Sequence, residues 1–67
     1  MQEGTVKWFS TERGYGFIQP TSGGRDVFVH ITALEAAGLR NLNEGQKIRF
    51  ELKTERGKTA AVNLQVA

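Results

Sequence analysis

The stretch RGYGFIQPTSGGRDVFVHI, from Arg13 to Ile31, decides how this chain folds. It contains two extended segments, and side chains two residues apart share one face of a strand. One face is then aromatic and the other aliphatic: Tyr15, Phe17, Phe28 and His30 fall on the first, and Ile18, Val27, Val29 and Ile31 on the second. A small β domain needs only one apolar face for its core, so the other face needs a separate explanation.

The rest of the chain predicts short strands separated by turns. Strands are expected over residues 5–10, 14–19, 26–31 and 46–52, with Pro20 ending the second, and a last strand carries Val62 and Leu64 inward. In residues 46–52 the inward set is Ile48, Phe50 and Leu52. Residues 21–24, 43–45 and 55–58 have the composition of turns. Five short strands predict an all-β fold, a small and closed or nearly closed barrel.

One segment departs from the strand pattern. Residues 32–35, Thr-Ala-Leu-Glu, match a capping box, which places Thr32 at the start of a helix, and Gly38 is suited to end it. The segment has room for at most one short helical turn. Three leucines around it are then free to close one end of the barrel: Leu34, Leu39 and Leu42.

Length and composition exclude several classes of protein. A chain of 67 residues predicts one domain, residues 1–67. With no cysteine and a single histidine, we expect no disulfide, no metal site and no cofactor. The net charge of +2 and the pI near 9.4 permit a nucleic-acid partner but are equally typical of an ordinary solvated surface. No basic and apolar leader is visible, and nothing approaches the ~20 apolar residues of a membrane span, so we expect a cytoplasmic protein without membrane contact.

The aromatic face is expected to lie outside the barrel, because the aliphatic set of the middle strands matches the inward set of residues 46–52. Rings in strands usually pack in the core, and leaving one exposed forgoes roughly 1.5–3 kcal/mol. A core this small supplies only ~3–5 kcal/mol net, so several exposed rings indicate a binding surface. Basic residues stand among the rings along the chain: Lys7, Arg13, Arg25 and Arg56. Rings interleaved with positive charge favour an unpaired nucleic-acid strand, whereas reading a duplex would need a recognition helix.

Two motifs connect this interpretation with a family. Arg13-Gly14-Tyr15-Gly16-Phe17-Ile18 resembles the core of a ribonucleoprotein motif, although an RNA recognition motif domain needs two full helices and a longer chain. With Lys7-Trp8-Phe9 before it and Val27-Phe28-Val29-His30-Ile31 after it, the chain is similar to the bacterial cold-shock protein family over essentially its whole length. The resemblance implies a five-stranded antiparallel OB-type barrel.

The resemblance also implies the nucleic-acid-binding residues. The family's stacking positions fall on Trp8, Tyr15, Phe17, Phe28 and His30, and its polar contacts on Lys7, Arg13, Asp26 and Arg56. Strict alternation puts Trp8 on the side of Val6, so an outward Trp8 requires a bend or bulge in the first strand. Phe9, Ile31 and Leu39 are further candidates; the last two stand where the family has phenylalanine, which predicts a shorter or weaker site. Lys58 stands where the family often has proline, so the geometry near Arg56 is expected to differ.

By resemblance, the expected function is that of a passive RNA chaperone that regulates transcription and translation. It would bind single-stranded RNA or DNA by base stacking, as a monomer, with low sequence specificity and a preference for pyrimidines. The alternative is a small SH3-like barrel that binds proline-rich protein segments on exposed rings. An enzyme is the least expected class, with no catalytic residue and no small-molecule substrate predicted, because His30 has no evident carboxylate or nucleophile partner.

Overall fold

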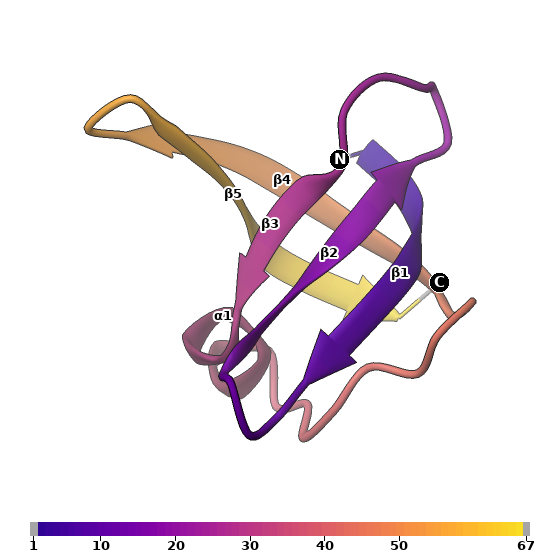
Figure 1. Cartoon of the computed structure of the whole chain (residues 1–67), viewed down its shortest axis with the longest axis vertical. Coiled ribbons are helices and arrows are strands. Elements are labelled where there is room, and N and C mark those ends of the chain that lie inside the picture. The colour runs from indigo at the N-terminus through magenta and orange to yellow at the C-terminus, as the bar shows by residue number, and fades with distance from the viewer. Residues whose placement is uncertain (1, 67) are drawn as a thin grey trace.

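The computed structural model describes residues 2–66, which form five strands and one short helix (Figure 1). In chain order these are β1 (Gln2–Ser10), β2 (Tyr15–Pro20), β3 (Val27–His30), α1 (Ile31–Ala36), β4 (Lys47–Glu55) and β5 (Lys58–Val66). The helix is far too short and polar to cross a membrane, and the described part of the chain holds no other helix. The strand pattern predicted from the sequence is confirmed, although β1 begins earlier and β4 ends later than expected, and β3 is shorter.

The strands close into a barrel in the order β1-β2-β3-β5-β4. Neighbouring strands pair antiparallel, except that β3 and β5 run parallel and meet at the pair Phe28–Ala60. The predicted antiparallel barrel is therefore correct apart from this parallel seam. Closure leaves one interior, so each strand can bury only one of its two faces.

The interior is filled by the aliphatic set that the sequence predicts. Ile18 and Val29 from the middle strands are fully buried, as are Ile48 and Phe50 from β4. Leu34 of α1 and Leu42 of the following loop close one end of the barrel, and Leu39 packs partly buried against them. The outward position of the aromatic set follows, because the interior is already occupied.

Two inward predictions in β4 and β5 are wrong. Leu52 is 42% exposed, because the hairpin of β4 and β5 continues beyond the body of the barrel (Figure 1). Val62 is only half-buried and Ala61 faces the core in its place, whereas the inward prediction for Leu64 is confirmed. Asn63 has a positive φ of 52°, and this left-handed residue breaks the two-residue alternation of β5.

The helix also begins differently from the prediction. Its N-cap is His30, not Thr32, and the His30 Nδ1 accepts a hydrogen bond from the Thr32 N–H at 3.2 Å. Ile31, predicted as the end of a strand, is therefore the first residue of α1. The predicted end of the helix is confirmed, because Gly38 follows it with a φ of 77°, a left-handed conformation that glycine adopts without strain.

Candidate nucleic-acid interface

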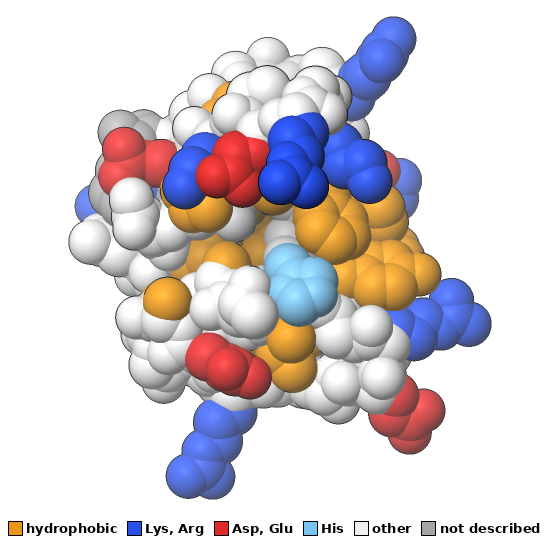
Figure 2. Space-filling view, turned by 90° about the vertical axis from the view of Figure 1, so that its left-hand side faces the viewer, with side chains coloured by type: hydrophobic (Ala, Val, Ile, Leu, Met, Phe, Trp, Pro, Cys, Tyr) orange, Lys and Arg blue, Asp and Glu red, His pale blue; other side chains and the backbone are white. Residues whose placement is uncertain are grey.

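Five ring side chains lie together on the outer wall formed by β1, β2 and β3. We call this set the aromatic platform: Trp8, Tyr15, Phe17, Phe28 and His30. Strand register creates it, since Phe17 lies opposite Trp8 on one side and Phe28 on the other, and Tyr15 lies opposite His30. The rings are half-buried except His30, which is exposed. Figure 2 shows hydrophobic surface beside the histidine, with basic side chains and an acidic one along its upper border.

The platform rings hold one another in place. The Trp8 ring centroid lies 5.5 Å from those of both Tyr15 and Phe17. Phe28 lies 5.7 Å from Tyr15, 6.0 Å from Phe17 and 6.3 Å from His30. Most of these contacts are tilted or edge-on, which is the favoured geometry of aromatic pairs. The rings thus form a fixed apolar surface that is only partly covered by protein.

A β-bulge turns Trp8 outward. The register of β1 against β2 shifts between Val6 and Trp8, so Lys7 is the extra residue. Val6 and Trp8 therefore lie on opposite sides of the strand, whereas strict alternation would place them on the same side. The bend that the sequence analysis requires is confirmed. Beyond the bulge, Phe9 packs against the core and lies over Gly16, where an added Cβ would come within 2.6 Å of the Phe9 ring. Phe9, a candidate site residue, therefore lies on the other side of β1 from the platform.

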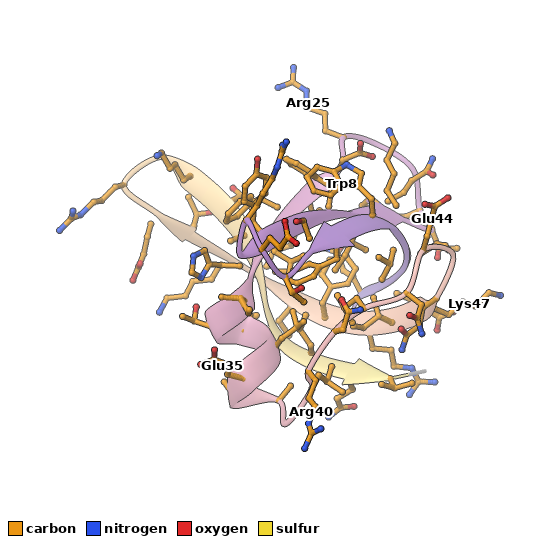
Figure 3. All side chains as sticks on the ribbon, turned by 60° about the horizontal axis from the view of Figure 1, so that its bottom comes forward. Trp8, Arg25, Glu35, Arg40, Glu44 and Lys47 are labelled. Atoms are coloured by element: carbon orange, nitrogen blue, oxygen red, sulfur yellow. The ribbon has the colours of Figure 1, made fainter. Side chains whose placement is uncertain are left out.

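The predicted polar residues do not converge on one point. The Lys7 ammonium binds the Asp26 carboxylate at 2.9 Å across the start of β3, with side chains 56% and 32% exposed. Arg13 lies in the turn between β1 and β2, and Arg56 in the turn between β4 and β5, both exposed. Arg25 extends outward from the loop before β3 (Figure 3). Positive charge is therefore spread around the rim of the platform, and part of it is neutralised by Asp26.

His30 is held by the start of the helix. Its Nδ1 accepts from the Thr32 N–H and lies 3.0 Å from the Thr32 hydroxyl. A backbone N–H can only donate, so Nδ1 carries no proton in this arrangement and the neutral ring carries it on Nε2. The helix cap thus fixes the orientation of an exposed ring at the end of the platform.

The two candidates at family phenylalanine positions lie off the platform. Ile31 begins α1, donates its N–H to the Gly14 carbonyl at 2.8 Å, and is half-buried. Leu39 packs against the core and donates its N–H to the Leu34 carbonyl. Neither side chain carries a ring, so neither adds to the row of rings, and the shorter or weaker site stays a prediction.

Sequence reasoning missed one part of the surroundings. The predicted turn at residues 55–58 is correct, but the strand expected over residues 46–52 extends to Glu55, so β4 and β5 remain paired up to the turn, at Glu55 and Lys58. Lys53 and Lys58 therefore lie on an ordered hairpin next to Phe28, and Ala60 lies between Phe28 and Lys53 in the register. The alternation of charged and apolar residues continues at positions 51–53, Glu-Leu-Lys, and this was the signal that the strand extends past Leu52.

The sequence matches a protein-family model described as the 'Cold-shock' DNA-binding domain over residues 2–67. It is 60% identical over 67 residues to the probable cold shock protein y4cH of Sinorhizobium fredii, covering 97% of both chains. It is 52% identical over 69 residues to cold shock protein CspA of Rhizobium meliloti, covering both chains completely. The identity to cold shock protein CspB of Geobacillus stearothermophilus is 53% over 62 residues, 91% of this chain and 92% of the relative.

Among solved structures, the chain resembles drosophila Unr CSD456 with a TM-score of 0.77 and 18% sequence identity. The match covers 98% of this chain and 26% of that one, so the chain spans about a quarter of its length. At this identity the likeness concerns the fold, and it confirms the predicted OB-type barrel.

Proposed function

This chain belongs to the cold-shock domain family, and from that premise we propose that its aromatic platform binds unpaired nucleic acid by base stacking. One observation carries the proposal: the rings of three adjacent strands lie outside a barrel whose core is complete without them. Stability does not account for this arrangement, since each ring left partly in water forgoes part of the roughly 1.5–3 kcal/mol that full burial supplies.

Stacking supplies most of the proposed affinity. A base on an aromatic ring is worth ~1–3 kcal/mol, and three or four bases give roughly 4–12 kcal/mol before the cost of ordering the strand. The dissociation constant then falls between micromolar and nanomolar. Since every base has a π-face, the complex has low sequence specificity, and the moderate charge of the rim keeps its salt dependence shallow.

Lys7 and Asp26 form the polar contact beside Trp8. An exposed ion pair of this kind contributes at most about 1 kcal/mol to stability, so an arriving base can replace it at little cost. The ammonium then donates to a base carbonyl, and the carboxylate accepts from a base N–H. Asp26 also keeps phosphate away from this corner, because two anions repel each other.

The biological role that follows is that of a passive RNA chaperone. A protein that binds only open strands stabilises them by mass action, by ~2.7 kcal/mol at a hundredfold excess over the dissociation constant. That amount opens weak hairpins and leaves long duplexes intact. Such activity affects transcription and translation through the structure of the transcript, and a monomeric cytoplasmic protein suits it.

Fluorescence of Trp8, the single tryptophan of the chain, tests the proposal. We expect unpaired oligopyrimidines, RNA and DNA alike, to quench it at micromolar concentrations or below, because a base stacks directly on the indole. The same sequence annealed to its complement serves as the control and should bind much more weakly. Equal binding of the duplex, or a response only to a proline-rich peptide, would contradict the proposal.

A further inference from the structure

The hairpin of β4 and β5 is a rigid arm beside the platform. Its turn has two central residues, Arg56 and Gly57, with φ angles of 51° and 77°. Positive φ at both positions is typical of a type I′ turn, whose twist matches that of paired strands. Pairing therefore continues to the tip, at Glu55 and Lys58, and Figure 1 shows the hairpin projecting from the barrel. The backbone of this arm is therefore ordered by strand pairing up to the turn, so it does not form an unpaired loop.

The row of platform residues continues onto this arm. Trp8 pairs with Phe17 and Phe17 with Phe28, and the register then runs from Phe28 to Ala60 and from Ala60 to Lys53. Residues paired in register share a face, so this row crosses all five strands on the outer wall. Four steps between strands span roughly 19 Å along the wall. Because the side chain of Ala60 is small, it does not fill the surface between Phe28 and Lys53.

The arm and Phe28 enclose an open groove of about 970 Å³. Its lining includes three basic residues, Lys53, Arg56 and Lys58, and one acidic residue, Glu55, so these four carry a net charge of +2. The Lys53 ammonium lies 3.4 Å from the Glu55 carboxylate, with side chains 61% and 74% exposed. Such an exposed pair is weak, so Lys53 is free to exchange it for a phosphate. Phe28 is the one ring in this lining, which suits backbone contact better than further stacking.

We infer that this groove is a phosphate-binding extension of the platform, in which Lys53 and Lys58 hold the backbone of an unpaired strand that leaves the rings at Phe28. The inference rests on the proposed function and specifies the path of the strand. Charge complementarity and continuity with the row of rings identify the occupant, a single-stranded polyanion whose bases are already stacked on the platform. Strands that cover only the rings do not reach the groove, and longer strands do.

The test compares the salt dependence of binding for short and long oligothymidylates, of about four and about eight nucleotides. Each phosphate held by a cation contributes about −0.7 to the slope of log K against log salt for a single strand. We expect the double variant K53Q/K58Q to make the slope for the long strand shallower by about 1.4 and to leave the slope for the short strand unchanged. Between ~50 and ~200 mM salt, its loss of affinity for the long strand should be about sevenfold smaller than that of the wild type.

The control is R40Q/K47Q, which removes the same charge from exposed residues that project away from Trp8 (Figure 3). Equal slopes for the two double variants with the long strand, or an equal change for both strand lengths, would overturn the inference while the proposed function stands. Failure of either oligonucleotide to quench the wild-type Trp8 would instead overturn the proposed function. Both double variants are expected to fold, because exposed substitutions of this kind rarely affect stability.

Discussion

The same substitution, phenylalanine to leucine, has opposite expected effects at two positions of this barrel. Phe28 is a half-buried ring of the platform, with neighbouring rings at 5.7, 6.0 and 6.3 Å, and Phe50 is a fully buried ring of the core. Leucine retains much of the apolar volume and removes the flat π-face. The pair of variants F28L and F50L therefore separates stacking from packing.

The magnitudes follow from these environments. A stacked base is worth ~1–3 kcal/mol by alanine substitution, and leucine keeps some of the contact, so F28L should weaken binding by about 1–2 kcal/mol, or roughly 5–30-fold. Its free energy of unfolding should fall by less than about 1 kcal/mol, because the ring is already partly exposed to water. F50L should lose about 1–2 kcal/mol of unfolding free energy through imperfect packing and bind within about twofold of the wild type.

Two assays on the same samples decide the matter. Urea denaturation gives the free energy of unfolding, and titration of Trp8 fluorescence with an oligothymidylate gives the affinity at a temperature where each variant is folded. Wild-type affinity in F28L would refute the reasoning, because it would mean that no base stacks on this ring. An equal loss of affinity in both variants would also refute it, because the outer ring would then act through the fold rather than through contact with a base.

Two further substitutions test the bulge and the ion pair. D26N removes the carboxylate that pairs with Lys7 at 2.9 Å and repels phosphate, so one phosphate can reach Lys7 and the salt slope of oligonucleotide binding should steepen by about 0.7. An unchanged slope would show that Asp26 does not keep phosphate away from Lys7. G16A would place a Cβ against the Trp8 carbonyl oxygen and 2.7 Å from the Phe9 Cα. It should therefore lower the free energy of unfolding, measured by urea denaturation, by about 1–3 kcal/mol. Wild-type stability would contradict the close approach of β1 and β2.

Much of this fold could be predicted because strand alternation is a local property. The two faces of residues 13–31 separate into core and platform by parity alone, and the inward positions of Ile18 and Val29 follow from it. Turn positions and the end of the helix could be predicted for the same reason, since glycine at a left-handed position such as Gly38 is a local requirement.

The errors occur where neighbouring strands decide the outcome. The exposure of Leu52 depends on where the body of the barrel ends, and parity within one strand contains no information on that. The half-buried position of Val62 depends on the left-handed Asn63, a residue type that tolerates positive φ without demanding it. The register of β5 against β3 and β4 brings Lys53 and Ala60 beside Phe28, and no local pattern places these residues together.

The candidate site shows the same division. Four of its five rings could be assigned to one face from sequence alternation, whereas Trp8 required the family resemblance, because the bulge at Lys7 reverses its side of the strand. Lys7 and Asp26 are 19 positions apart in the sequence, and they meet because β1 pairs with β2 and β2 pairs with β3. From charge composition alone Lys7 is a free cation, whereas in the structure its ammonium is paired with the Asp26 carboxylate.

Nuclear Overhauser contacts between an isotope-labelled protein and a bound unlabelled oligothymidylate test the central claim most directly. The account predicts contacts from thymine protons to the rings of Trp8, Phe17, Phe28 and His30, in an order that runs from β1 across β2 to β3. Thymine contacts that instead gather on α1 or on the loop that follows it, with the platform rings unaffected, would contradict it.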